Sequence, residues 1–294
     1  DEVFNNFAQK PAFHNMGKTI SYQELETECK KFGSYLQNDL NLQPGDKVAL
    51  MMPNILQYPI ALFGLLKAGF VAVNVNPLYT ARELEHQLKD SGARAIVIFA
   101  NSAHILEKVI ANTPVKHVII TQIGDLLGFP KSMIVNFVIK YIKKMVPAYN
   151  LPKAVCFKKA LRLGEKAALK PVSIQREDAA FLQYTGGTTG VAKGAELSHG
   201  NIIANVLQAK SWLGDRILGD KQIIITPLPL YHILSLTANC IIFFTIGGLN
   251  VLITNPRDFK GFIKEIKNWD FTAITGVNTL FNVLMNEEDF KSVN

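Results

Sequence analysis

The stretch that decides the fold lies between residues 48 and 99, where three apolar segments alternate with helical patterns. The segments read Val48-Ala-Leu-Met-Met52, Phe70-Val-Ala-Val-Asn-Val75 and Ala95-Ile-Val-Ile-Phe99. Each is apolar almost without interruption, which is typical of strands covered on both faces. The amphipathic helices between them supply the crossovers that parallel strands need. The alternation predicts an α/β fold with parallel sheets flanked by helices.

The helices carry their own start and stop signals. Ser21 with Glu24, and Thr80 with Glu83, match the capping box, in which side chain and backbone satisfy each other at a helix N-terminus. Gly92 follows the second of these helices and is expected to end it in a left-handed conformation.

The same alternation resumes after residue 178. Strands are expected at 180–184, 222–225, 250–253 and 271–275, and Asn255 is expected to cap a helix with Pro256 at its first position. Residues 222–256 carry no charged side chain, but prolines and glycines divide them into runs too short to cross about 30 Å of hydrocarbon. We predict two α/β subdomains, 1–170 and 171–294, as parts of one larger domain.

Composition excludes several classes of protein. The chain has 294 residues, of which 48% are hydrophobic and 19% charged, and this excludes a disordered or collagen-like protein. Three distant cysteines provide neither a disulfide framework nor the spacing of a zinc site, so a reducing, cytoplasmic location is expected. Basic and aromatic residues are not interleaved as in proteins that track a nucleic-acid strand, so no nucleic-acid partner is expected.

The net charge of +7 is concentrated in one segment. Residues 131–170 hold ten lysines and arginines against the single acid Glu165, a local charge of +9, so the rest of the chain sums to −2. Within 133–146 the polar positions follow helical spacing and leave a broad apolar side; they are Asn136, Lys140, Lys143 and Lys144.

Two interpretations of this basic amphipathic segment stay open. The favoured one is a helix that packs on the core through its apolar side and exposes its lysines, because core helices are commoner. The other is a helix that rests on an anionic bilayer surface. The second would make the protein peripheral to the inner face of the cell membrane.

The segment that carries the chemistry is Tyr184-Thr-Gly-Gly-Thr-Thr-Gly-Val-Ala-Lys-Gly194. Its glycines let backbone N–H groups approach an anion, its threonines add hydroxyls and its lysine adds charge, which predicts a cradle for a polyphosphate. The spacing differs from the Walker loop, whose lysine enters a helix directly, so we expect a link between two strands. The candidate phosphate-binding residues are Thr185, Gly186, Gly187, Thr188, Thr189, Gly190, Lys193 and Gly194.

This segment resembles the phosphate-binding loop of the adenylate-forming superfamily, which includes acyl-CoA synthetases, luciferase and peptide-synthetase adenylation domains. Pro227-Leu-Pro-Leu-Tyr-His-Ile233 resembles the second core motif of that superfamily, and Thr272-Ala-Ile-Thr-Gly-Val-Asn-Thr-Leu-Phe281 resembles the segment that lines its acyl pocket. Two early segments, 49–54 and 73–79, also match. Along essentially the whole chain the resemblance is greatest to the bacterial long-chain fatty-acid–CoA ligases.

The resemblance implies a two-step ligase. A carboxylate attacks the α-phosphate of ATP, which gives an acyl-adenylate and pyrophosphate, and the thiol of CoA then displaces AMP. ATP, Mg²⁺ and CoA are the implied cofactors and substrates. Thr185 matches a threonine that helps hold Mg²⁺, and His232 matches a histidine at the edge of the carboxylate site and is the candidate catalytic residue. The acyl pocket would be bordered by His232, Gly276, Val277 and Thr279.

The resemblance also implies what lies outside this chain. In the superfamily a Mg²⁺-binding glutamate and a small C-terminal domain with a catalytic lysine follow later. We therefore expect a large N-terminal domain that is truncated before the C-terminal domain and is inactive alone.

Several alternatives remain open. The substrate could be another carboxylic acid, or the protein could be a non-catalytic lipid- or membrane-binding module. As bare sequence His232 could also be a core histidine after a proline-rich turn. A homodimer is kept as a candidate assembly.

Overall fold

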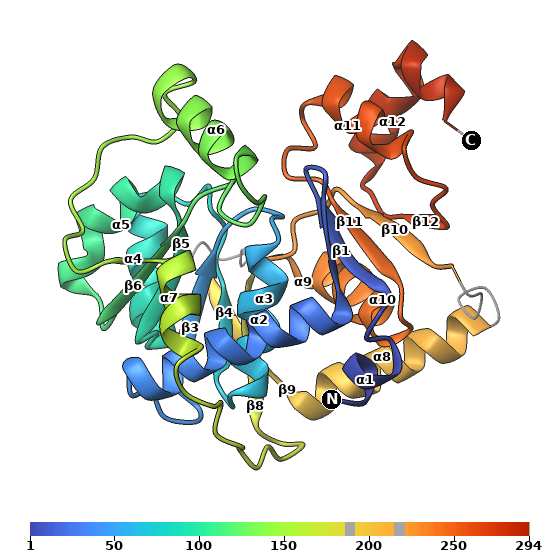
Figure 1. Cartoon of the computed structure of the whole chain (residues 1–294). Helices are drawn as coiled ribbons and strands as arrows, with labels where there is room; N and C mark the ends of the chain where they lie inside the picture. Colours follow the sequence, from blue (N-terminus) through green and yellow to red (C-terminus); the bar gives the residue numbers. More distant parts are fainter. Residues whose placement is uncertain (186–191, 215–220, 294) are drawn as a thin grey trace. The chain divides into compact units, whose positions relative to one another are not determined.

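The computed structural model describes residues 1–185, 192–214 and 221–293, and the chain divides into two compact units (Figure 1). Unit 1 comprises residues 1–24, 53–56 and 204–294. Unit 2 comprises residues 25–52 and 57–203. Each unit is built on one β-sheet with an apolar core, and the predicted fold class, parallel sheets flanked by helices, is confirmed.

Unit 2 contains a seven-stranded sheet in the order β7-β6-β5-β3-β4-β8-β9. Its strands are β3 (Lys47–Met51), β4 (Val71–Asn74), β5 (Ala95–Phe99), β6 (His117–Thr121), β7 (Val155–Cys156), β8 (Ala179–Thr185) and β9 (Lys193–Ser198). Every pair is parallel except β8 with β9. Strands β4 and β5 are buried along their whole length, as expected for parallel strands covered on both faces.

The helices of unit 2 follow the predicted alternation. They are α2 (Tyr22–Ser34), which begins in unit 1 and continues as the π-helical turn η1 (Tyr35–Asp39), α3 (Gln57–Lys67), α4 (Ala81–Ser91), α5 (Ala103–Val109), α6 (Lys131–Phe137) with the π-helical turn η4 (Val138–Ile142), and α7 (Phe157–Gly164). Short 3₁₀ turns η2 (Ala100–Ser102) and η3 (Ile110–Asn112) flank α5. Both capping boxes are confirmed, and Gly92 ends α4 with φ 66°.

The core of unit 2 fixes α4 against the sheet. Leu84 and Leu88 of α4 are fully buried in one cluster with Ile96 and Ile98 of β5. These leucines are four residues apart, so they share the face of α4 that packs inward. Because this leucine face is packed on the sheet, the face of α4 next to it also has a fixed position relative to the sheet.

Unit 1 contains a five-stranded sheet in the order β12-β10-β11-β1-β2. Its strands are β1 (Pro11–Asn15), β2 (Lys18–Ser21), β10 (Ile223–Thr226), β11 (Leu249–Leu252) and β12 (Ala273–Ile274). Strand β2 runs antiparallel to β1, and the other pairs are parallel. The hairpin β1–β2 was not predicted.

The helices of unit 1 are α1 (Glu2–Asn6), α8 (His199–Leu213), which begins in unit 2, α9 (Ile233–Ser235), the π-helical turn η6 (Leu236–Ile241), α10 (Ile242–Thr245), α11 (Phe259–Ile266), α12 (Asn278–Asn286) and the 3₁₀ turn η7 (Glu288–Ser292). The predicted cap at Asn255 is wrong. Helix α11 begins later and is capped by Asp258, which accepts from the Gly261 N–H at 3.1 Å. Asn255 instead closes a turn by accepting from the Arg257 N–H at 3.3 Å.

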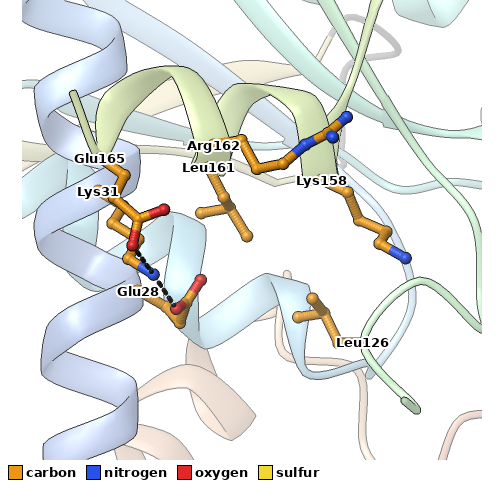
Figure 2. A pocket seen from close by; sticks show the side chains of 7 residues that line it. All are labelled: Glu28, Lys31, Leu126, Lys158, Leu161, Arg162 and Glu165. Atoms are coloured by element: carbon orange, nitrogen blue, oxygen red, sulfur yellow. Dashed lines mark hydrogen bonds and ion pairs between the residues drawn. The ribbon is translucent and has the colours of Figure 1, made fainter. Parts of the chain in front are cut away.

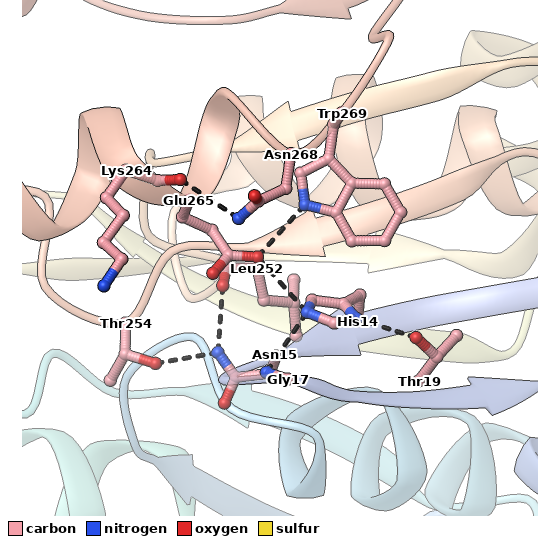
Figure 3. Close-up of polar contacts among 10 residues, drawn as sticks. All are labelled: His14, Asn15, Gly17, Thr19, Leu252, Thr254, Lys264, Glu265, Asn268 and Trp269. Carbon is pink, nitrogen blue, oxygen red and sulfur yellow. Dashed lines mark hydrogen bonds and ion pairs between the residues drawn. The ribbon is translucent and has the colours of Figure 1, made fainter. Parts of the chain in front are cut away.

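Figure 3 shows how polar side chains attach the hairpin to the rest of unit 1. His14 is buried, with Nδ1 2.7 Å from Thr19 Oγ1 and Nε2 3.2 Å from Glu265 Oε1. The Trp269 indole donates to the same Glu265 oxygen at 3.0 Å. Asn15 Nδ2 donates to the Leu252 carbonyl at 2.9 Å. This cluster joins β1 to α11 and β11 through groups that would be costly to bury unpaired.

The structure divides the chain differently from the predicted boundary at residue 170. Strand β8 pairs with β4, and β9 pairs with β8, so the segment up to residue 203 extends the sheet of unit 2. The first residues of the chain instead pair with β11 in unit 1. Strand pairing between distant segments is a tertiary property, which the alternation of elements along the chain does not encode.

The favoured interpretation of 133–146, a helix packed on the core through its apolar side, is also wrong. The helix forms as α6 and η4, but most of its large apolar side chains are exposed. The buried residue of α6 is the polar Ser132. Within the described residues, no helix combines the length and the apolar character needed to cross a bilayer.

Candidate functional site

Strands β8 and β9 carry the predicted phosphate-binding segment between them. In their antiparallel register Thr185 lies opposite Lys193, and Tyr184 lies opposite Gly194. The prediction that the loop links two strands is confirmed. Thr185, Lys193 and Gly194 are exposed at this end of the hairpin. The other predicted phosphate-binding residues lie outside the described part of the chain: Gly186, Gly187, Thr188, Thr189 and Gly190.

Helix α4 braces both strands of this hairpin. The Tyr184 hydroxyl donates to Asp90 Oδ2 at 2.5 Å, and His86 Nε2 donates to the Ala192 carbonyl at 3.0 Å. His86 and Asp90 are four residues apart and therefore share one face of α4. Burial and the adjacent Asp90 carboxylate raise the pKa of Tyr184, so its hydroxyl stays a donor at neutral pH.

Gly194 has a packing role in addition to the backbone freedom predicted for it. A Cβ added at Gly194 would lie 2.8 Å from Cζ of the Tyr184 ring. The missing side chain leaves room for the ring to lie across the strand. This glycine therefore allows Tyr184 to reach Asp90 on α4.

A buried polar network supports β8 from the other side. The Tyr58 hydroxyl donates to Asn74 Oδ1 at 2.7 Å, and Asn74 Nδ2 donates to Gln183 Oε1 at 3.0 Å. Gln87 of α4 donates to the Asn74 carbonyl at 2.8 Å. Neither this network nor His86 and Asp90 was predicted. Polar residues within a helix or strand do not reveal their partners, so the sequence carries no signal of these contacts.

His232 follows β10 in unit 1, in a proline-rich segment that Asn54 holds in place. Asn54 Nδ2 donates to the Thr226 and Leu228 carbonyls at 3.0 and 2.9 Å, and its Oδ1 accepts from the Leu230 N–H at 2.8 Å. Asn54 is buried, so it substitutes for the backbone partners that the two prolines remove.

The His232 ring itself is exposed, so the alternative of a core histidine is wrong. Its Nδ1 accepts from the Leu234 N–H at 3.3 Å at the start of α9. A nitrogen that accepts is unprotonated, so the neutral ring carries its proton on Nε2. The backbone thereby orients one N–H donor outward.

The predicted acyl-pocket residues leave the same edge of the sheet of unit 1 as the His232 segment. Strands β10 and β12 are parallel neighbours, and Gly276 comes two residues after β12. Asn239 ties the two strand ends together, since it donates to Thr275 Oγ1 at 2.7 Å and to Thr226 Oγ1 at 3.3 Å. The structure thus brings His232 to the edge where three predicted residues begin: Gly276, Val277 and Thr279.

The two groups of candidate residues belong to different units. Thr185, Lys193 and Gly194 are in unit 2, and His232 and the 276–279 segment are in unit 1. In α/β proteins, ligand sites typically lie at the carboxyl ends of parallel strands, which is where both groups of candidate residues lie in their own units.

The described residues are compatible with Mg²⁺ only as an ion held mainly by a bound nucleotide. Outside the gaps at 186–191 and 215–220, no group of three or more His, Cys, Asp and Glu residues could hold a metal ion. The exposed hydroxyl of Thr185, in a strand pair with Lys193, fits an ion that arrives on a nucleotide. Mg²⁺ usually keeps several waters and is held by substrate phosphates with few protein oxygens, so a single hydroxyl is compatible.

A separate pocket of about 370 Å³ lies in unit 2 between α2 and α7 (Figure 2). Lys31 on its wall forms ion pairs with Glu28 at 3.0 Å and Glu165 at 3.1 Å. Lys158 and Arg162 of α7 also line it. None of the predicted site residues does, so this pocket is distinct from the candidate site.

The chain resembles known proteins along its whole length. The family described as AMP-binding enzyme matches this chain over residues 1–294. Curated long-chain-fatty-acid–CoA ligases from Haemophilus influenzae and Salmonella typhimurium are 57% and 55% identical over 100% of this chain and 52% of their own length. The chain thus spans about half the length of these relatives.

Solved structures show the same fold at lower identity. An anthranilate CoA ligase in complex with anthranoyl-AMP superposes with a TM-score of 0.82 at 19% identity over 99% of this chain and 52% of its own. A long-chain-fatty-acid-CoA ligase from Archaeoglobus fulgidus gives 0.78 at 23% identity over 97% and 52%. The full-length match and the hairpin geometry agree with the resemblance found in the sequence, and the chain belongs to the AMP-binding enzyme family.

Proposed function

We propose that the protein activates a long-chain fatty acid with ATP to an acyl-adenylate and transfers the acyl group to CoA. The observation that carries the proposal is the β8–β9 hairpin, where Thr185 faces Lys193 and α4 braces both strands. The choice of fatty acid as substrate is supported by relatives at 55–57% identity that are named long-chain-fatty-acid–CoA ligases.

The chemistry explains why such a hairpin is needed. A carboxylate is a poor electrophile because its leaving group would be oxide, and adenylation supplies a stable leaving group. Two anions, the carboxylate and the triphosphate, must then meet. The Lys193 ammonium and the hydroxyl of Thr185 would offset their repulsion by binding phosphate oxygens. When bound, Mg²⁺ would neutralise phosphate charge, with Thr185 as its protein ligand.

His232 would act on the acid. Its ring is held by the Leu234 N–H so that Nε2 presents a proton outward. That N–H would donate a hydrogen bond to an oxygen of the carboxylate and later of the acyl-adenylate. We assign the segment of Gly276, Val277 and Thr279 to the wall of the acyl pocket, because it begins at the same sheet edge.

The test is fatty-acid-dependent ATP–pyrophosphate exchange by the product of the complete gene. Lys193→Ala should lower exchange at least tenfold and weaken Mg²⁺-ATP binding, whereas Lys166→Ala, an exposed lysine of unit 2 outside the site, should change neither. A panel of carboxylic acids of graded length distinguishes a long-chain ligase from a ligase for another acid. Equal ATP binding by wild type and Lys193→Ala would instead favour a non-catalytic lipid-binding module.

We also propose where the enzyme works. A cytoplasmic enzyme that is peripheral to the inner face of the cell membrane would meet its substrate where long-chain acids partition. The exposed apolar and basic residues of α6 and η4 support this location. A homodimer stays a prediction, and size-exclusion chromatography of the complete gene product would test it.

A further inference from the structure

Exposed apolar side chains gather on one short segment of unit 2. In the described part of the chain fifteen large hydrophobic residues are exposed, and seven of them fall within residues 129–145. Each of the seven is more than half exposed: Phe129, Met133, Ile134, Phe137, Tyr141, Ile142 and Met145. Soluble surfaces usually scatter such residues singly, so a cluster of this kind marks an interaction surface.

Two polar residues of this segment, Ser132 and Asn136, face inward and hold it in place. Asn136 Oδ1 accepts from the Gly124 N–H at 2.8 Å, and its Nδ2 donates to Asp125 Oδ1 at 3.1 Å. A Cβ on Gly124 would lie 2.7 Å from Asn136 Oδ1, so this close approach needs a glycine. Ser132 is buried beside it. The helix is thus attached through Ser132 and Asn136 and exposes most of its large apolar residues, the reverse of a core helix.

The apolar side is ordered by its own contacts. The rings of Phe137 and Tyr141 lie 5.1 Å apart, and the Lys140 ammonium lies 5.2 Å from the centre of the Tyr141 ring. In this arrangement the methylene stem of a lysine can contact apolar surface while its ammonium group stays in a polar layer such as the headgroup region of a bilayer.

The charge around this surface has one sign. Residues 126–164 contain eight lysines and arginines and no acidic residue. Four of the eight lie within or next to the helix: Lys131, Lys140, Lys143 and Lys144. Apolar residues ringed by lysines, without acids, complement a bilayer whose headgroups are anionic.

We propose that the outward side of α6 and η4 (Figure 1, green) inserts into the interfacial layer of an anionic lipid bilayer. Phe137, Ile134 and Tyr141 enter the acyl boundary, and the lysines bind headgroup phosphates. The hydrogen bonds of Asn136 with Gly124 and Asp125 keep the apolar side facing the lipid. This inference deepens the proposed location at the membrane and rests on it, while the ligase chemistry does not depend on it.

The test measures binding of the complete gene product to sedimented vesicles of phosphatidylcholine containing one third phosphatidylglycerol. The affinity of wild type for these vesicles should be at least about tenfold higher than for vesicles of pure phosphatidylcholine. Binding should fall as salt is added. Ile134→Asn with Phe137→Asn should reduce binding at least tenfold. Leu78→Asn with Met285→Asn, a pair outside this segment that is even more exposed, should leave binding unchanged.

Two further measurements separate this inference from its rivals. ATP–pyrophosphate exchange, measured with a water-soluble acid and no vesicles, should be the same for wild type and for Ile134→Asn with Phe137→Asn. If wild type shows no exchange in this assay, the result counts against the ligase activity and not against the membrane-binding surface. Adding the anionic vesicles should slow hydrogen exchange at 129–145. Unchanged exchange there, or vesicle binding by the variant equal to wild type, would overturn the inference in favour of another protein segment or a second copy as the occupant.

Discussion

At the scale of single residues, the candidate site depends on side chains whose size or hydrogen bonds no other residue type would reproduce. Asn54 satisfies three backbone groups of the proline-rich segment before His232, and Asn239 links the ends of β10 and β12. Each is buried, so replacing either would leave unpaired polar groups that cost about 1 to 3 kcal/mol apiece. Thr185, Lys193 and His232, which would touch substrate in the proposed reaction, are exposed, whereas Asn54 and Asn239 are buried.

Gly194→Ala tests the packing of the hairpin. The new Cβ would lie 2.8 Å from Cζ of Tyr184, so the ring must move and its hydrogen bond to Asp90 must weaken. We expect the free energy of unfolding to fall by about 1 to 3 kcal/mol, as in other overpacked sites. The apparent KM for ATP should rise as well. Urea denaturation and steady-state kinetics of the complete gene product measure both.

The control for this substitution is Ala195→Ser, one residue along the same exposed strand. It should change the free energy of unfolding by no more than about 0.5 kcal/mol. If Gly194→Ala were as stable as this control, the ring would have space that the structure does not show.

At the scale of elements, the hairpin and its helix form one functional part. Helix α4 is fixed to the sheet through Leu84 and Leu88 and reaches the hairpin through His86 and Asp90. Strands β3, β4, β5 and β8 of unit 2 could be predicted from their apolar segments, and β5 was predicted to the residue at both ends. Hairpin β1–β2 could not, because its turn uses Met16 with φ 49°, a conformation that sequence signals assign to Asn or Asp.

We predict that α4 positions the phosphate-binding hairpin. His86→Ala and Asp90→Ala each remove a contact to one strand, so each should raise the KM for ATP several-fold and change kcat less. Because both residues act on one hairpin, their effects should be non-additive in a double-mutant cycle. His86→Gln retains an N–H donor and should recover part of the loss.

Glu85→Gln provides a matched control on the same helix. Glu85 pairs with Lys89 at 2.6 Å on the solvent side and does not contact the hairpin. Its KM for ATP should equal that of wild type. Variants of His86 and Asp90 that shift only the melting temperature, with an unchanged KM, would show that α4 stabilises the fold without positioning the loop.

At the scale of the whole molecule, pH acts on stability through two half-buried histidines. Burial, and then Lys116 and Arg94, lower the pKa of His117 below 6.5. Burial lowers the pKa of His199 as well, against an opposing effect of Asp178. Near pH 6 these two histidines therefore bind more protons in the unfolded chain than in the folded one. The free energy of unfolding should rise with pH through the window below 6.5 and reach its full value above it.

Urea denaturation between about pH 5 and pH 7 checks this pH dependence. His117→Gln with His199→Gln should flatten the rise relative to wild type, and the comparison cancels the groups that the two proteins share. A double variant with the same slope as wild type would mean that other groups set the pH dependence.

The sequence alone determined the α/β class, the capping boxes, the position of most strands and the hairpin character of the phosphate segment. These properties follow from local periodicity and from residue types whose backbone preferences act within a few positions. Only the tertiary structure decided that the 179–198 hairpin joins the sheet of unit 2, that α4 braces it, and that α6 turns its apolar side outward. Each of these depends on contacts between segments distant in the chain, such as Tyr184 with Asp90 and Asn136 with Gly124, and local patterns carry no information about such partners.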